Sequence, residues 1–278
     1  MQLFVEQLTN VDFSYLHAGR GLVGETWWAS ATLDGAPDDQ GMICDFGTVK
    51  KTLRNWLDSE LDHRLLVPLR SPALSLTQHA GTIGLQWQYD SGEQLSMSAP
   101  EQAVALVDAE VINAESVSRW CREQLRSHFP GNVGQLELSF AAEHIEAAFY
   151  HYSHGLKKHA GNCQRIAHGH RSRIQIWLDD QRAGDLETFW AERWADVYLG
   201  SHEDLTGRSD GQLSFHYHAQ QGEFAISLPA HRCYLMDSDT TVEYIACHLA
   251  QKIKSSHPQS EVRVRAFEGV NKGAVASA

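Results

Sequence analysis

Apolar residues recur at helical spacing in four segments of the chain, two in each half. The segment from residue 46 to 61 predicts a helix with one buried face, because its apolar positions lie three or four apart: Phe46, Val49, Leu53, Trp56 and Leu57. A second helix is predicted around residues 117–125, and the second half repeats the pattern at 186–197 and 242–253. Alternating apolar and polar residues around Trp87 and Phe215 predict a hairpin between the helices of each half.

The two halves also share short motifs. The stretch LRSHFP (125–130) resembles IKSSHP (253–258), and an acidic residue lies near the start of each preceding helix, Glu115 and Glu243. Both correspondences are 128 positions apart (130 to 258 and 115 to 243). This period is too long for a solenoid repeat. It predicts two tandem modules, residues 1–145 and 146–278, each an α+β module with an antiparallel sheet and two helices packed on one face.

The composition is that of a folded globular protein. Of the 278 residues, 42% are apolar and 21% are charged, which is more apolar content than disordered chains carry. The formal net charge of −12 argues against a nucleic-acid partner, because phosphates require a basic surface. The small, polar stretch 269–278 is expected to fray.

The sequence predicts a cytoplasmic protein. No run approaches the roughly 18 apolar residues of a membrane-spanning helix, so we expect no membrane partner. Residues 1–10 lack the basic and apolar regions of a signal peptide. The five cysteines are odd in number and scattered, which favours free thiols in a reducing compartment over a disulfide framework.

A cluster of histidines begins the second module. Residues from Ile166 onward alternate in polarity, so His168 and His170 share one face of a predicted strand. His154 ends the preceding strand-like run, and the three imidazoles converge if the two strands pair. Three nitrogen ligands without a fourth suit a catalytic zinc ion (Zn2+) that keeps one position open. Alternatively, in a chain with 16 histidines, such a pair decorates the surface or forms a hydrogen-bonded core pair.

Cys163 lies in the predicted loop between these two strands. It follows Gly161 and Asn162 and lies beside Arg165 and several histidines. Cationic neighbours favour the thiolate form of a cysteine, which makes Cys163 a candidate reactive thiol. A lone cysteine is more often a small buried hydrophobe, and spacing alone leaves that alternative open.

These residues resemble the motifs of the 6-pyruvoyl-tetrahydropterin synthase and 6-carboxytetrahydropterin synthase family, and the likeness covers nearly the whole chain. The second module carries the family's cysteine shortly before His-Gly-His. The resemblance implies three zinc-binding histidines and one catalytic cysteine: His154, His168, His170 and Cys163. It also implies two pterin-binding glutamates: Glu243 in Thr-Val-Glu (241–243) and Glu268 after Val-Arg-Val (262–264).

The first module carries the complementary family motifs, GMICDF (41–46) and LDHRLL (61–66). The resemblance implies that Asp62 and His63 are catalytic, although the two residues by themselves also fit a capped helix end with a solvated pair. In the family the cysteine comes from one subunit and the Asp-His pair from its neighbour. A fused chain could therefore keep one complete site between unlike modules.

Each module lacks family motif residues that the other module keeps. In the first, His17 is retained, but Val23 and Glu25 stand where two zinc histidines are expected, so the metal end has decayed. In the second, Ser201-His202 stands at the place of the Asp-His pair. The resemblance thus implies a single complete site per chain.

The resemblance further implies two tunnelling-fold modules that associate edge to edge into a barrel, so the expected partners are further copies of the chain. It implies a zinc-dependent lyase acting on 7,8-dihydroneopterin triphosphate, with four basic residues as candidates for the triphosphate: Arg165, Arg171, Lys157 and Lys158. We expect 6-carboxytetrahydropterin, the queuosine and deazapurine precursor, as the product. The 6-pyruvoyl product, a different three-histidine zinc hydrolase and a non-catalytic pterin-binding scaffold stay open as alternatives.

Overall fold

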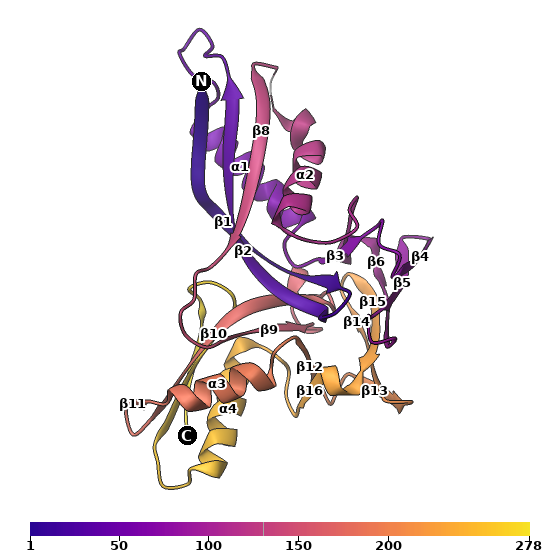
Figure 1. Cartoon of the computed structure of the whole chain (residues 1–278), viewed down its shortest axis with the longest axis vertical. Helices are drawn as coiled ribbons and strands as arrows, with labels where there is room; N and C mark the ends of the chain where they lie inside the picture. Colours follow the sequence, from indigo (N-terminus) through magenta and orange to yellow (C-terminus); the bar gives the residue numbers. More distant parts are fainter. Residues whose placement is uncertain (130) are drawn as a thin grey trace.

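A computed structural model of the chain describes residues 1–129 and 131–278, so Pro130 of the LRSHFP motif lies outside the described residues. The molecule is elongated (Figure 1). The long strands and helices of the two halves lie at opposite ends, and the short hairpin strands of both halves gather at one side. No helix in the described part of the chain is long and apolar enough to cross a membrane.

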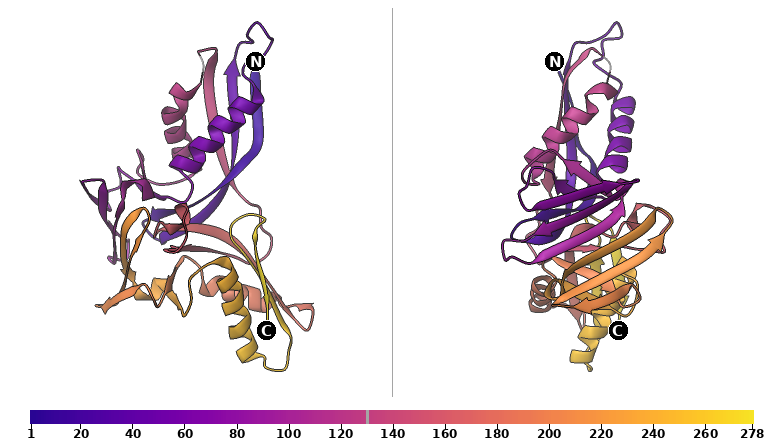
Figure 2. Two further views of the ribbon diagram at one scale, coloured as in Figure 1. Left: turned by 180° about the vertical axis from the view of Figure 1, so that it is seen from behind. Right: turned by 90° about the vertical axis from the view of Figure 1, so that its right-hand side faces the viewer.

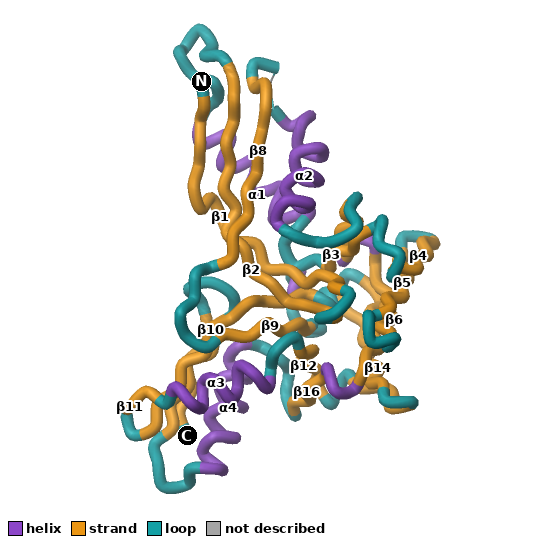
Figure 3. The backbone as a smooth tube through the Cα atoms, in the orientation of Figure 1, coloured by secondary structure: helices purple, strands orange, loops and turns teal. Residues whose placement is uncertain are grey.

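The two halves follow the same order of elements. The first contains β1 (Gln2–His17), β2 (Gly21–Gly35), α1 (Phe46–Glu60), β3 (Leu65–Pro68), β4 (Leu74–His79), β5 (Thr82–Gln88), β6 (Gln94–Pro100), β7 (Val104–Val107), α2 (Ala114–Leu125) and β8 (Val133–Ala142). The second contains β9 (Phe149–His154), β10 (His168–Leu178), β11 (Gln181–Arg182), α3 (Gly184–Arg193), β12 (Val197–Ser201), β13 (Leu205–Ser209), β14 (Gln212–Ala219), β15 (Gly222–Pro229), β16 (Cys233–Met236), α4 (Val242–Ser256), β17 (Val262–Phe267) and β18 (Gly273–Ser277). Figure 3 shows these helices and strands along the backbone.

The helices begin close to where the sequence predicts them. Asp45 caps α1, because its carboxylate accepts the Thr48 N–H at 2.8 Å. The apolar positions of α1 are buried apart from Phe46, which is exposed. The helix predicted at 186–197 ends earlier, at Arg193, and Val197 already belongs to β12. The C-terminal stretch does not fray as expected, since β18 pairs with β17.

Each half has a mixed sheet, which differs from the antiparallel sheet expected. The first sheet has the order β7-β3-β1-β2-β8, with β3 parallel to both β1 and β7. The second has the order β16-β12-β9-β10-β17-β18, with β12 parallel to both β9 and β16. The parallel pairs follow from long connections, because a tight turn can join only antiparallel strands. The chain passes through α1 or α3 before β3 or β12, and through the three hairpin strands of each half before β7 or β16. The long strands β1, β2 and β8, like β9, β10 and β17, are antiparallel.

A third sheet joins the two halves. Its order is β13-β14-β15-β6-β5-β4, and β15 pairs with β6 in an antiparallel register that sets Ala225 opposite Ser98. The right-hand view of Figure 2 shows these strands of both halves side by side. Alternate residues of the sheet, such as Trp87 and Phe215, are buried in one core shared by the two modules. This shared core fixes how the modules sit together.

The modules also meet where β1 and β2 cross β9 and β10. Ser14 Oγ lies 2.7 Å from Ser153 Oγ at this crossing. A Cβ atom on Gly24 would lie 1.8 Å from the backbone oxygen of Tyr152, and one on Gly169 would lie 2.4 Å from the same oxygen. Two glycines, one from each module, therefore allow the backbones to approach this closely.

We predict that Gly24→Ala lowers the stability of the chain, because backbone atoms of the other module cannot move aside for the new methyl group. Overpacking of this kind costs about 1–3 kcal/mol. Thermal and urea unfolding would measure the change. Gly134→Ala is the matched control, since the nearest atom to its Cβ would be 3.7 Å away. Equal stability of the two variants would contradict the close crossing.

Candidate active site

Three histidines of the second module converge on one point. Strand pairing places His154 opposite His168, and His170 lies two residues further along β10 on the same face. The ring centroids are 4.4 Å apart for His154 and His168, and 5.3 Å apart for His154 and His170. One nitrogen from each ring lies within 4.8 Å of the others. All three side chains are buried, and their nitrogen atoms form a cluster that could hold a metal ion.

The surroundings of these histidines fit a metal ion. The Nδ1 atoms of His154 and His168 face backbone oxygens, of Thr240 at 3.0 Å and Arg165 at 2.9 Å. Holding one ring nitrogen in this way directs the other towards a metal. Among the described residues, the Nε2 atoms of His154 and His170 are buried with no hydrogen-bond partner. Burial and the charge of His170 lower the pKa of His154 to about 3, so its imidazole is the neutral form that a metal ligand requires.

His170 is held by a residue that sequence analysis missed. Its Nδ1 lies 3.2 Å from a carboxylate oxygen of Asp12, which comes from β1 of the other module. Asp12 is almost fully buried. Burial would raise the pKa of this carboxyl, but the charges of His170 and Lys272 and the hydroxyl of Thr26 lower it well below its usual range. Asp12 lies five residues before His17, and nothing in its local sequence indicates that it faces the other module.

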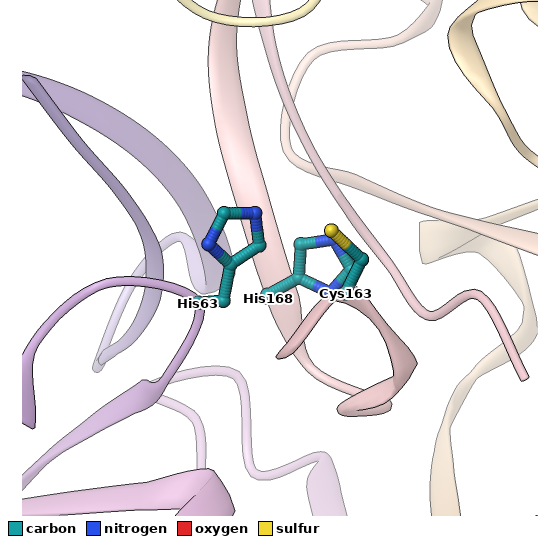
Figure 4. Close-up of side chains that lie close together, drawn as sticks. All are labelled: His63, Cys163 and His168. Atoms are coloured by element: carbon teal, nitrogen blue, oxygen red, sulfur yellow. The ribbon is translucent and has the colours of Figure 1, made fainter. Parts of the chain in front are cut away.

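Cys163 and His63 lie beside the metal cluster, although they come from different modules. One donor atom each of His63, Cys163 and His168 lies within 4.8 Å of the others, and Figure 4 shows the three side chains together. The rings of His63 and His168 are 5.0 Å apart. Cys163 lies in a single turn of 3-10 helix, Asn162–Gln164. The expected meeting of the two modules' residues therefore occurs within one chain.

Asp62 and the backbone of Asp12 fix His63 in place. The His63 N–H donates to the backbone oxygen of Asp12 at 2.6 Å, and the Asp12 N–H donates to the Asp62 carboxylate at 2.8 Å. The other carboxylate oxygen of Asp62 bonds Nδ1 of His63, which leaves Nε2 for Cys163. Burial alone would lower the pKa of His63, but Asp62 and Cys163 raise it to about 10. His63 is therefore a cation at neutral pH.

The two predicted pterin-binding glutamates have different surroundings. Glu268 follows β17 and lies 3.4 Å from Lys272, with one-fifth of its side chain exposed. Burial raises the pKa of Glu268, but the interactions with His170 and Lys272 outweigh burial and lower it. Glu243 is exposed in the first turn of α4 and makes no ion pair or side-chain hydrogen bond with the described residues. The structure places only Glu268 next to the metal cluster.

The candidate phosphate-binding residues are largely engaged by other groups. Lys157 contacts Asp204 at 2.6 Å, and Lys158 contacts Asp239 at 3.0 Å. Arg165 donates to the backbone oxygen of Asp62 at 3.3 Å and so helps to join the modules. The remaining candidate, Arg171, donates to a backbone oxygen at 2.6 Å.

The decayed end of the first module has become a set of structural contacts. Tyr15, and not His17 as the sequence suggested, occupies the position that corresponds to His154, because Tyr15 pairs with Val23 as His154 pairs with His168. His17 is exposed, and its Nδ1 accepts the N–H groups of Gly19 and Arg20, each at 3.1 Å. Val23 is buried and apolar. Glu25 accepts the backbone N–H of the next residue at 2.9 Å, and burial raises its pKa to about 7.

The counterpart of His63 in the second module is Asp196, not Ser201-His202 as the sequence suggested. Asp196 follows α3 and precedes the parallel strand β12, and its φ of 57° matches the 56° of His63. It binds Arg20 through two hydrogen bonds of 2.6 and 2.9 Å. Ser201 and His202 lie at the far end of β12.

The fold and the site define a protein of two α+β modules with one candidate metal centre between them. A model of the family described as 6-pyruvoyl tetrahydropterin synthase matches the chain twice, at residues 15–151 and 144–278. The chain therefore belongs to the 6-pyruvoyl tetrahydropterin synthase family, a family of pterin-processing lyases, and holds two copies of its domain in tandem.

Solved structures similar to the chain include 6-pyruvoyltetrahydropterin synthase of Plasmodium vivax, at 19% identity and a TM-score of 0.42. The 6-pyruvoyl tetrahydropterin synthase of Plasmodium falciparum is similar at 19% identity and a TM-score of 0.40. Each likeness covers 51% of this chain and 90% of the other. No curated protein sequence matches the chain.

We predict that the protein binds about one divalent metal ion per chain, because the first module has lost its ligands. His168→Ala removes one of three donors and should abolish tight binding. Metal analysis after zinc loading and dialysis would measure the stoichiometry. His216→Ala is the control, since His216 is exposed on β14 and pairs with Glu223. Two tightly held ions per chain, or full retention in His168→Ala, would contradict the assignment.

Proposed function

We propose that this protein is a zinc-dependent lyase that converts 7,8-dihydroneopterin triphosphate and water to 6-carboxytetrahydropterin, triphosphate and acetaldehyde. One observation carries the proposal: His63 of the first module and Cys163 of the second lie together beside the histidine cluster. A thiol, an imidazole oriented by a carboxylate and a metal-binding cluster form the set of groups that proton transfer at a hydroxylated side chain requires.

His154, His168 and His170 would hold the zinc ion. Three imidazole ligands with no fourth protein ligand are typical of catalytic zinc. The bound ion would polarise oxygen atoms of the substrate side chain and make neighbouring protons more acidic. The Thr240 and Asp12 oxygens that hold His154 and His170 would keep the ligand geometry fixed.

Cys163 and His63 would move the protons. The Cys163 sulfur would take a proton from a side-chain carbon of the substrate and return it at the neighbouring carbon. His63, cationic at neutral pH, would donate a proton from Nε2 while Asp62 stabilises its charge at Nδ1. Glu268 would accept hydrogen bonds from the amino and ring N–H groups of the pterin, and Glu243 is the second acceptor that we propose.

Product analysis tests this function. We predict that the zinc-loaded wild-type protein releases triphosphate from 7,8-dihydroneopterin triphosphate and yields a product with the mass of 6-carboxytetrahydropterin. Cys163→Ala should lower turnover about 10²–10⁴-fold with the zinc content unchanged, because the thiol moves protons and does not bind the metal. Cys247→Ala, at an exposed position of α4, should retain full activity.

Other outcomes of the same experiment identify the alternatives. A product with the mass of 6-pyruvoyl-tetrahydropterin would assign the other branch of the family. Pterin binding without turnover would indicate a non-catalytic scaffold, and turnover of unrelated esters or amides alone would indicate a zinc hydrolase. Near-normal activity of Cys163→Ala would limit this residue to a structural role.

We also propose that several chains close a barrel, with the boundary between modules at residues 145 and 146, in the connection from β8 to β9. Within one chain all three sheets end in strands with a single partner, among them β8, β18, β13 and β4. Unpaired sheet edges favour association with further strands. Light scattering at micromolar concentration should show an oligomer, and a strictly monomeric mass would refute the closed barrel. A cytoplasmic location stays a prediction.

A further inference from the structure

A line of charged groups runs from the first module across the candidate site to Glu268. The Lys272 Nζ atom lies 3.1 Å from one carboxylate oxygen of Asp12 and 3.4 Å from one of Glu268. The other carboxylate oxygen of Asp12 faces His170 at 3.2 Å and accepts the Thr26 hydroxyl at 2.5 Å. One lysine thus joins the carboxylate that holds a metal-binding histidine to the glutamate at the pterin position.

The tight turn between β17 and β18 brings Lys272 back to Glu268. The Glu268 N–H donates to the Lys272 backbone oxygen at 3.0 Å, which closes the turn. Gly269 and Asn271 both have left-handed backbones, with φ of 65° and 57°. A Cβ atom on Gly269 would lie only 2.5 Å from the Asp12 carboxylate, so glycine permits the close approach of the first module.

The side chains of Asp12, Lys272 and Glu268 differ in how far they are exposed to a ligand. The Asp12 side chain is 2% exposed, and its carboxylate oxygens contact Lys272, His170 and Thr26. Lys272 is 48% exposed, and Glu268 is 20% exposed. An ammonium group carries three N–H donors, and one of those of Lys272 donates to Asp12 while the ion pair with Glu268 engages at most one more. On the exposed side of the cluster, the Glu268 carboxylate can therefore accept hydrogen bonds from a ligand, and the Lys272 ammonium group beside it can donate one.

Two neighbouring carboxylates stabilise the charged form of the Lys272 amine. Burial alone would lower the pKa of Lys272, but the Asp12 and Glu268 carboxylates outweigh burial and raise it. Asp12 is fixed by β1, Thr26 and the packing of Gly269. It therefore keeps the Lys272 amine beside Glu268 and prevents it from swinging into solvent.

We propose that Lys272 is a specificity-determining residue, which donates a hydrogen bond to the 4-oxo oxygen of a 2-amino-4-oxopteridine while Glu268 accepts from the adjacent ring N–H and 2-amino group. The order of groups on this edge of the ligand, two donors followed by an acceptor, matches a carboxylate followed by an ammonium group. Asp12 acts as the positioning residue of Lys272. This inference rests on the proposed function, since it assigns the part of the substrate that the site recognises.

The test compares two fluorescent ligands that differ at one position, pterin (2-amino-4-oxopteridine) and 2,4-diaminopteridine. Both are titrated into the zinc-loaded full-length chain, and the ratio of their Kd values is the readout. Wild-type protein should prefer pterin, because a 4-amino group places a donor against the Lys272 donor and the ring N3 beside it carries no hydrogen for Glu268 to accept; the change of this preference in Lys272 variants isolates the lysine. Lys272→Met should reduce the preference about tenfold, as expected for loss of one hydrogen bond to a charged group.

Two further variants separate recognition from structural support. Lys272→Arg keeps a cationic donor and should retain most of the preference. Lys252→Met is the matched control, because Lys252 is exposed on α4 and makes no ion pair with the described residues. A purely structural lysine would weaken the binding of both ligands equally in Lys272→Met.

The possible results are distinct. An unchanged ratio of Kd values in Lys272→Met overturns this inference alone, whatever the change in absolute affinity. Binding of neither ligand by the wild-type chain overturns the proposed function and this inference with it. A ratio that falls in Lys272→Met, recovers in Lys272→Arg and stays constant in Lys252→Met supports the inference.

Discussion

The close crossing of two pairs of strands, β1 and β2 over β9 and β10, is the contact on which the candidate site depends. Gly24 and Gly169 have no Cβ atoms, so backbone meets backbone at this point. The shared core under the six-stranded sheet then holds the modules in one orientation. As a result, the turn after α1 lies over the histidines of β9 and β10, and His63 reaches His168. A shift of a few ångströms at the crossing would separate the thiol from its imidazole partner.

The site concentrates charged and polar groups where the modules meet, and each group is matched. Asp12 faces His170 and Lys272, Asp62 faces His63, and the backbone oxygens of Thr240 and Arg165 face two of the clustered histidines. Buried charges are tolerated only with such partners. The exceptions are the Nε2 atoms of His154 and His170, which are buried and have no hydrogen-bond partner among the described residues, as expected of donors that could hold a metal ion.

The duplication explains why the two modules can differ. The crossing brings a second set of corresponding positions together, but there Asp196 binds Arg20 and the Glu25 carboxylate is buried against the backbone. At these positions an ion pair between the modules and a hydrogen bond within the first module stand in place of a second set of site residues. In a fused chain each module needs to keep only half of one site, so the other half can change into a structural contact.

The sequence by itself determined the duplication, the helices and hairpins, and the residues of the metal cluster, because these depend on periodicity and on neighbours along the chain. His168 and His170 share a strand face whatever surrounds the strand. The tertiary structure alone decided that β3 and β12 run parallel to their neighbours, that Asp196 and not Ser201-His202 corresponds to His63, and that β18 is ordered. It alone joined Asp12 and Lys272, which are 260 positions apart. Such contacts arise from packing between modules, and no local pattern of residues records them.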